Sequence, residues 1–264
     1  MQLHNKRVLI TGGSSGIGFA LAQAFVARGA KVFITGRRQS ALDDALRRLQ
    51  TTAGVCADVG TAEGRSATLE QALQSLGGLD ILVNNAGGVR AGRLENTSPA
   101  EIEQMVTVDL LAPILLTRSA LESLRSSGDA MVVNIASGIA LVGAPFYATY
   151  AAVKAGLAHF GEALRRELKG EGIHVLTAYP GGTDTPMMRS NRAGPELGFS
   201  LEPAEAVAQA IIEGIEKDAF DVIRGGEVRA EMIAVNRTNP AAVDEKFLTL
   251  KDALEDAVKD HNAL

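Results

Sequence analysis

Short apolar runs rich in β-branched residues alternate with longer segments of helical periodicity along most of this chain. Most of the short runs are almost continuously apolar, which is typical of strands buried on both faces. Strands and helices that alternate in this way form a parallel sheet with helices on both faces, joined by right-handed crossovers. Seven strands are predicted, starting at Arg7, Lys31, Gly54, Asp80, Ala130, Ile173 and Phe220. The expected fold is therefore α/β, a doubly wound, Rossmann-like, seven-stranded parallel sheet.

Helices are predicted between these strands and after the last one. Their approximate ranges are 16–28, 40–50, 61–76, from Ser98 onward, 146–168, 202–217 and 247–264. Ser98 and Pro99 suit the cap and the first turn of a long helix. The 264 residues contain no evident linker. We expect a single dinucleotide-binding and catalytic domain over 1–264, with a substrate loop at about 186–200 and a helical tail at about 240–264.

Composition excludes several classes of protein. The net charge of -5 disfavours a nucleic-acid binder, which is normally basic. Cys56 is the only cysteine, so neither an intrachain disulfide nor a cysteine metal cluster is expected. The N-terminal apolar run is too short for a signal peptide, and no stretch approaches the roughly 18 apolar residues of a membrane span. The expectation is a soluble cytoplasmic protein with no metal and no membrane partner.

A glycine-rich turn, TGGSSGIG, follows the first predicted strand and runs directly into a helix. Glycines let the backbone approach a pyrophosphate closely, and a helix N-terminus offers free N–H groups and a positive dipole end. The spacing is GxxxGxG rather than GxGxxG, and such a turn alone is often only a tight turn. Its place between a strand and a helix favours phosphate binding. The residues concerned are Gly12, Ser14, Ser15, Gly16, Ile17 and Gly18.

The end of the second strand indicates which dinucleotide would bind. A fold that takes NAD usually has an acidic residue here, which accepts a hydrogen bond from the ribose 2′-hydroxyl. Gly36 takes that place, and Arg37 and Arg38 follow it. A guanidinium can bind a 2′-phosphate, which a carboxylate would repel. The alternative is a pair of solvated arginines. The pattern favours NADP(H) over NAD(H) as cofactor.

Three further strand ends should meet at the same edge of the sheet, where open α/β sheets bind ligands. After the third strand, an acidic and an apolar residue suit an adenine ring, although a plain turn or a helix cap is the alternative. After the fourth, small residues leave room for a ribose, and asparagine amides can join neighbouring strand ends. After the sixth, a loop suits the nicotinamide carboxamide or a phosphate. The residues are Asp58, Val59, Asn85, Ala86, Gly87, Pro180, Gly181, Thr183 and Thr185.

Tyr150 and Lys154 stand four residues apart, so on a helix their side chains point the same way. A free phenol has a pKa of roughly 10, and a neighbouring ammonium lowers it. The hydroxyl of Ser137, at the end of the fifth strand, would hold a substrate oxygen beside the phenol. A lone YxxxK pattern usually means nothing, and Tyr147 has no lysine four residues on. Together with Ser137 and the glycine loop, the pair predicts a proton donor and acceptor.

Taken in their order along the chain, these motifs resemble the short-chain dehydrogenase/reductase family in its compact single-domain form. The motifs are TGGSSGIG, NNAG, the Ser137–Tyr150–Lys154 arrangement and PGGTDT. The resemblance covers roughly residues 6–220. It implies an oxidoreductase that moves hydride between NADP(H) and a small-molecule carbonyl or alcohol. Tyr150 would be the acid and base, Lys154 would bind ribose and lower the pKa of Tyr150, and Ser137 would orient the substrate oxygen.

The same resemblance implies cofactor contacts and an assembly. The contacts would come from Gly12, Ser15, Ile17, Arg37, Asp58, Asn85 and Thr183. A homodimer or homotetramer would form through the long helices starting near Ser98 and Phe146. One departure concerns Asp109, because many members have an asparagine there that completes a catalytic tetrad. We expect an active enzyme whose pH profile is altered by this extra charge near Lys154.

Substrate recognition is expected from three segments, 88–93, 139–147 and 186–200. Val142, Phe146, Met187 and Met188 suit an apolar pocket or an ordinary core, so the substrate itself is not predicted. Other functions remain open: an NAD-linked enzyme of the same fold, a non-catalytic NADP(H) sensor, or an interaction protein that uses the helix from Phe247. The intact Ser137, Tyr150 and Lys154 set argues against a sensor, which needs no proton donor.

Overall fold

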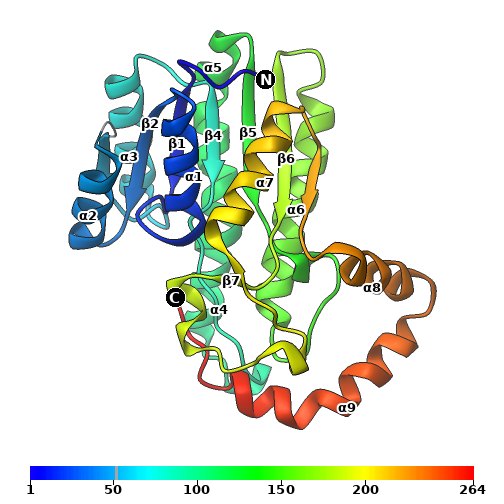
Figure 1. The fold of residues 1–264 in the computed structure, drawn as a ribbon. Coiled ribbons are helices and arrows are strands. Elements are labelled where there is room, and N and C mark those ends of the chain that lie inside the picture. The colour runs from blue at the N-terminus through cyan, green and yellow to red at the C-terminus, as the bar shows by residue number, and fades with distance from the viewer. Residues whose placement is uncertain (51–52) are drawn as a thin grey trace.

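The computed structural model describes residues 1–50 and 53–264, and it confirms the seven-stranded parallel sheet (Figure 1). The strand order is β3-β2-β1-β4-β5-β6-β9, so the crossovers reverse direction between β1 and β4. The strands are β1 Arg7–Thr11, β2 Lys31–Gly36, β3 Ala53–Cys56, β4 Ile81–Asn84, β5 Ala130–Ile135, β6 Ile173–Tyr179 and β9 Asp221–Ile223. Ligands in such sheets bind beyond the carboxyl ends of the strands, at this point of reversal.

Alternating residues of each central strand enter different cores, which explains why the strands are apolar throughout. In β1, Val8 and Ile10 belong to the core under helices α1 (Gly16–Ala27), α2 (Gln39–Leu49) and α7 (Ala204–Glu216). Leu9 belongs to the core under α3 (Ala62–Leu76), α5 (Ala112–Ser127) and α6 (Ala148–Glu167). All three side chains are fully buried. Because successive side chains of a strand point to opposite faces, both faces of the sheet need apolar residues.

The helices occupy most of the predicted ranges. They are α1 Gly16–Ala27, α2 Gln39–Leu49, α3 Ala62–Leu76, α4 Pro99–Val106, α5 Ala112–Ser127, α6 Ala148–Glu167, α7 Ala204–Glu216, α8 Gly226–Thr238 and α9 Pro240–Val258. Ser98 caps α4 as predicted, in a reciprocal capping box with Glu101. A π-helical turn, Thr107–Leu111, joins α4 to α5 and contains Asp109. Such turns are frequent at functional sites.

The end of the chain differs from the prediction. α8 was not predicted. α9 begins at Pro240 and ends at Val258, whereas the predicted helix ran from residue 247 to residue 264, so the prediction is wrong for the last six residues. α8 carries no fully buried residue, so it lacks the apolar stripe on which a prediction depends. A small second sheet, β7 Thr183–Asp184 with β8 Glu202–Pro203, was also missed because each strand has only two residues.

The continuous helical stretch Pro99–Ser127 is long and apolar enough to cross a membrane by length and composition, contrary to the expectation that no stretch approaches this. This is weak support for a span, because core helices of globular proteins meet the same criteria. Here α5 buries Leu116, Ala120 and Leu124 against the sheet.

Candidate active site

The glycine loop after β1 wraps around the side chain of Asn85. Gly12 has a φ of +65°, and a Cβ there would lie 2.9 Å from the Cα of Ala86. A Cβ on Gly18 would collide with the Asn85 amide. Ser15 is the N-cap residue of α1, yet its side chain makes no capping hydrogen bond. The loop therefore has the bare backbone and the open helix N-terminus that a pyrophosphate needs, while Ile17 packs its side chain against the core.

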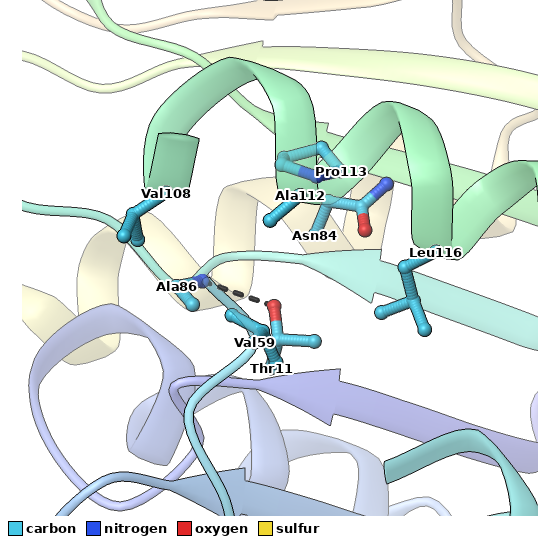
Figure 2. Close-up of a pocket in the computed structure, with 8 residues that line it drawn as sticks. All are labelled: Thr11, Val59, Asn84, Ala86, Val108, Ala112, Pro113 and Leu116. Carbon is cyan, nitrogen blue, oxygen red and sulfur yellow. Dashed lines mark hydrogen bonds between the residues drawn. The ribbon is translucent and has the colours of Figure 1, made fainter. Parts of the chain in front are cut away.

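Thr11 joins this loop to the end of β4, a role that the sequence reading missed. Its Oγ1 accepts hydrogen bonds from the backbone N–H groups of Asn85 and Ala86, both at 3.0 Å. Figure 2 shows the bond from Ala86. Asn85 Nδ2 in turn donates to the backbone oxygens of Thr11 and Gly12. One residue earlier, Asn84 Nδ2 donates to the side-chain oxygen of Asn134 on β5. The prediction that asparagine amides join neighbouring strand ends is confirmed.

A shallow hollow lies beside these residues (Figure 2). Val59, Ala86 and Val108 line it, which places an apolar surface where an adenine ring was expected. Asp58 is bound locally, because its Oδ1 accepts from the N–H of Gly60 at 2.8 Å. The cap of α3 is Thr61 and not Asp58, so of the two structural alternatives for Asp58 the turn is correct.

Arg37 faces the same edge of the sheet from the end of β2. It is exposed and lines a second hollow together with Gly87, Gly88 and Asp109. Arg38 is also exposed and occupies the N-cap position of α2. A Cβ on Gly36 would lie 2.6 Å from Ser14 Oγ. An acidic side chain at position 36 would therefore require Ser14 to move.

Asp109 and Lys154 form a buried ion pair in the middle of this edge. Lys154 Nζ lies 3.0 Å from Asp109 Oδ1 and donates to the backbone oxygen of Ile135 at 3.1 Å. The other carboxylate oxygen of Asp109 accepts from the N–H of Gly88. Burial raises the pKa of Asp109 although the lysine opposes it. Burial lowers the pKa of Lys154, but the charge of Asp109, the Tyr150 side chain and the hydrogen bond with Asp109 together outweigh it and hold this pKa above its usual value.

Tyr150 stands next to this pair on α6, with Lys154 Nζ 5.7 Å from the centre of its ring. Burial raises the pKa of Tyr150, and the charge of Asp109 adds to this effect. The charge of Lys154 and a hydrogen bond with Ser137 lower the pKa of Tyr150, but they do not outweigh burial and the charge of Asp109. The expected influence of Lys154 is present. The expected net lowering of the pKa is wrong for the protein without cofactor, because burial and Asp109 dominate.

The remaining predicted residues lie around this centre. Ser137 is half-buried at the end of β5 and accepts from the N–H of Ile139. Pro180 O accepts from the N–H of Gly138 at 2.7 Å, which fixes the end of β6 against the segment that carries Ser137. Thr183 donates to the backbone oxygen of Gly181. Thr185 lies against Gly16, because a Cβ on that glycine would be 3.1 Å from Thr185 Cγ2.

An apolar cluster packs around Tyr150 on the side where a substrate is expected. It combines Phe146 and Tyr147 with Met187 and Phe199 of the 186–200 segment, and with Leu254 of α9. Tyr150 packs against this cluster. The Tyr147 hydroxyl accepts a hydrogen bond from Asn191 at 3.0 Å. The expected apolar pocket residues Phe146 and Met187 therefore meet here, together with α9, whose part the sequence reading did not specify.

The last residues of the chain, Lys259–Leu264, form a strap across the end of β4. Ala91 N donates to His261 O, and Ala263 N donates to Val89 O. Leu264 lines the second hollow beside Gly88. The strap is another part of the site without a sequence signal, because nothing in its composition indicates where it attaches.

Comparison with known proteins agrees with this arrangement. The family model of the short chain dehydrogenases matches residues 6–196, and the chain belongs to this family. It is 33% identical over 255 residues to the ketoacyl reductase HetN of Nostoc sp., covering 93% of this chain and 89% of the relative.

Solved structures give the same result. A 3-ketoacyl-(acyl-carrier-protein) reductase of Brucella melitensis, complexed with NADH, superposes with a TM-score of 0.76 at 26% identity. A short chain dehydrogenase of Burkholderia cenocepacia in complex with NADP superposes with a TM-score of 0.77 at 29% identity. Each match covers 84% of this chain and 96% of the other. The chain thus has the fold and the sequence features of an oxidoreductase family.

Proposed function

We propose that this protein reduces a carbonyl, or oxidises the corresponding alcohol, with NADP(H) as cofactor. The convergence of Ser137, Tyr150 and the Lys154–Asp109 pair at the carboxyl edge of the sheet carries the proposal. The glycine loop ends at the same edge, so a bound dinucleotide and the phenol would share one site.

Each residue has a distinct part in the proposed reaction. The bound cofactor would supply hydride to the carbonyl carbon. Tyr150 donates its phenolic proton to the carbonyl oxygen, and the Ser137 hydroxyl donates a hydrogen bond to that oxygen and holds it in place. The phenolate that remains is stabilised by the Lys154 ammonium until a proton from solvent restores it. In the oxidation of an alcohol the same proton moves in the reverse direction.

The preference for NADP(H) rests on residues of this chain, because the similar structures include complexes with NADH and with NADP. Ser14 stands where a side chain at position 36 would need space, which disfavours an acidic residue there. Within residues 1–50 and 53–264 the exposed Arg37 side chain makes no hydrogen bond or ion pair, although its charge acts on Asp109, so the guanidinium can bind a 2′-phosphate.

A titration tests the cofactor preference. Purified protein is titrated with NADPH and with NADH, and the fluorescence of the reduced nicotinamide is followed, since the chain has no tryptophan. Tighter binding of NADPH is expected, with a loss of roughly ten- to hundredfold in Arg37→Ala, the range of one charge-assisted contact. Arg47→Ala, at an exposed arginine of α2, is the matched control. Equal or tighter binding of NADH, indifferent to the Arg37 substitution, would overturn the preference for NADP(H) and leave the proposed hydride transfer standing.

A panel of ketones tests the chemistry. Reduction of any of them should fall by at least about a hundredfold in Tyr150→Phe, since general acid catalysis contributes this much. The variant should still bind the dinucleotide. If the wild type binds the cofactor but reduces no ketone, the alternative of a non-catalytic sensor gains support.

We further propose that the protein forms a homodimer or homotetramer. Val106 and Leu111, on the surface of the long helical stretch, are 39% and 44% exposed. Burial of these side chains against a second copy would remove apolar surface from water. The molar mass in solution, measured by light scattering, tests this.

A further inference from the structure

Arg229, in the first turn of α8, reaches across to the segment that carries Ser137. A Cβ on Gly138 would lie 3.1 Å from Arg229 Cζ, so the guanidinium rests on the bare backbone of that glycine. A Cβ on Gly225 would lie 2.8 Å from the Cβ of Arg229. Two glycines thus make room for this one side chain, at the residue that directly follows Ser137.

The Arg229 guanidinium has no counter-charge among the described residues 1–50 and 53–264. Arg229 is only partly exposed, and within residues 1–50 and 53–264 its side chain makes no hydrogen bond or ion pair. Burial lowers its pKa. Arg224, five residues earlier, shows the usual arrangement, with its Nη2 2.6 Å from a carboxylate oxygen of Glu202. A partly desolvated cation without a partner costs free energy, and an anion brought to it would recover that cost.

We propose that Arg229 binds the carboxylate of an oxo-acid substrate whose ketone is held by Ser137 and Tyr150. The inference rests on the proposed function and adds the class of substrate. A planar guanidinium binds a carboxylate through two parallel hydrogen bonds, which also fixes its orientation. α8 lies beyond the region matched by the family model, which ends at residue 196.

The geometry limits the length of such a substrate. Because Gly138 and Ser137 are adjacent, the guanidinium lies no more than roughly 11 Å from the Ser137 hydroxyl, by standard backbone dimensions. A carboxylate a few carbons from the ketone spans this interval. Acetoacetate and levulinate, which place one and two methylene groups between the ketone and the carboxylate, are suitable probes, and their methyl esters are neutral equivalents.

The test compares kcat/KM for each acid with that for its methyl ester, with saturating NADPH. The wild type should prefer at least one acid over its ester. Arg229→Gln should reduce kcat/KM for that acid by roughly ten- to hundredfold, as expected for one charged hydrogen-bonded contact, and leave the ester nearly unchanged. Arg229→Lys should give an intermediate value, because it keeps the charge but loses the planar fork. Arg237→Gln, an exposed arginine on the same helix, is the matched control and should have no effect.

A second measurement does not depend on turnover. Levulinate should raise the thermal midpoint of the wild-type protein loaded with NADP⁺, and this rise should be absent in Arg229→Gln. An equal rise in both proteins, no rise in either, or an acid-to-ester ratio that Arg229→Gln leaves unchanged would each overturn the inference. Reduction of the esters that disappears in Tyr150→Phe would leave the proposed function standing in all of these cases.

Discussion

At the scale of single residues, the direct contact between Asp109 and Lys154 sets the electrostatics of the site. The usual asparagine would leave the full charge of the lysine acting on Tyr150. Here a carboxylate 3.0 Å from the ammonium cancels much of that field. The charge of Asp109 also raises the pKa of Tyr150 directly. The protein without cofactor therefore holds its phenol in the protonated form, which is the form that donates to a ketone.

Asp109→Asn should move the pH–rate profile toward acid. With the carboxylate gone, the ammonium of Lys154 acts on Tyr150 unopposed and the pKa of the phenol falls. Alcohol oxidation, which needs the phenolate, should then rise at lower pH than in the wild type. Ketone reduction, which needs the phenol, should begin to decline at lower pH. Steady-state rates over a range of pH in both directions measure this.

Asp129→Asn is the control for Asp109→Asn, because Asp129 pairs with Lys6 at the opposite end of the sheet. It should leave both pH profiles in place. A profile that Asp109→Asn leaves unchanged would mean that Asp109 has no special influence on proton transfer.

The sequence was sufficient to predict an extra charge near Lys154. It did not reveal that Gly88 and the π-helical turn hold that charge in direct contact with the ammonium.

At the scale of elements, the strap Lys259–Leu264 depends on a buried histidine. His261 is 1% exposed, and its Nδ1 lies 3.1 Å from Ser190 Oγ in the 186–200 segment. Burial, aided by the charge of Arg90, lowers the pKa of His261 to about 4. The imidazole is therefore neutral at physiological pH, and the strap connects the 186–200 segment to the residues that follow β4.

Acid should loosen the strap. Because the pKa of His261 is lower in the folded protein than in the unfolded chain, its contribution to stability is full above about pH 6.5 and is lost as the pH falls toward 4. The loss amounts to at most about 3 kcal/mol. Hydrogen exchange at the Ala91 amide, which donates to His261 O, should accelerate over this range once the intrinsic pH effect is subtracted.

His261→Gln should abolish this part of the pH dependence, because the amide does not titrate. His174→Gln, at an exposed position on β6, provides the comparison and should behave as the wild type. If the Ala91 amide exchanged equally slowly at pH 7 and pH 4.5 in the wild type, the histidine would not control the strap.

Whether a strand or a site residue could be predicted depends on whether a pattern in the neighbouring sequence marks it. The central strands β1, β2, β4, β5 and β6 were found because buried parallel strands are continuously apolar. Tyr150, Lys154 and Ser137 were found because their spacing has meaning on a helix and at a strand end. Arg229, His261 and Thr11 were not found. Their importance comes from contacts with distant residues such as Gly138, Ser190 and Asn85, and no local pattern records those contacts.

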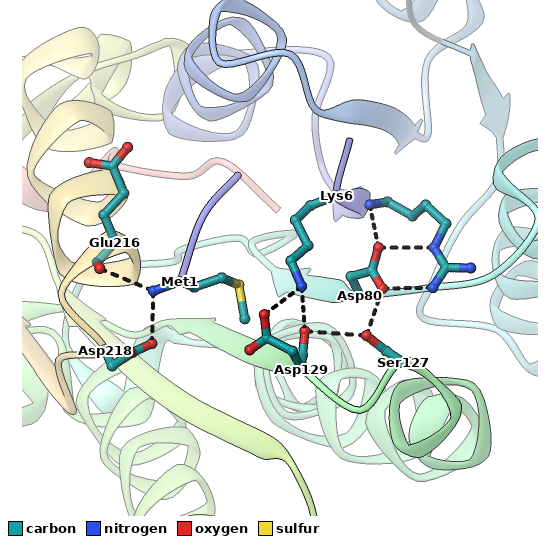
Figure 3. A network of polar contacts seen from close by, with 8 residues as sticks. Met1, Lys6, Asp80, Ser127, Asp129, Glu216 and Asp218 are labelled. Atoms are coloured by element: carbon teal, nitrogen blue, oxygen red, sulfur yellow. Dashed lines mark hydrogen bonds and ion pairs between the residues drawn. The ribbon is translucent and has the colours of Figure 1, made fainter. Parts of the chain in front are cut away.

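At the scale of the whole molecule, the two ends of the sheet have separate tasks. The carboxyl ends of the strands carry the candidate site. The amino ends carry a polar network in which Asp80 receives hydrogen bonds from Arg7 and Ser127, and Lys6 binds Asp129 (Figure 3). These contacts join β1, α5 and the residues before β4 and β5 at the centre of the sheet.

This separation predicts a substitution that alters stability without altering the site. Burial raises the pKa of Asp80, but hydrogen bonds from Arg7 and Ser127 outweigh it and lower the pKa to about 2. The carboxylate thus stabilises the fold fully above about pH 4, and this contribution is lost as the pH falls toward 2. Asp80→Asn should lower the free energy of unfolding at pH 7 by about 2 kcal/mol, seen as a lower urea midpoint. Asp129→Asn, which breaks an exposed pair, should change the free energy of unfolding by less than about 1 kcal/mol.

In both variants the dissociation constant for NADPH should equal that of the wild type, because the full length of β1 and β4 separates Asp80 from the glycine loop. A weaker affinity in Asp80→Asn alone would show instead that the amino-end network positions the cofactor loop through these strands.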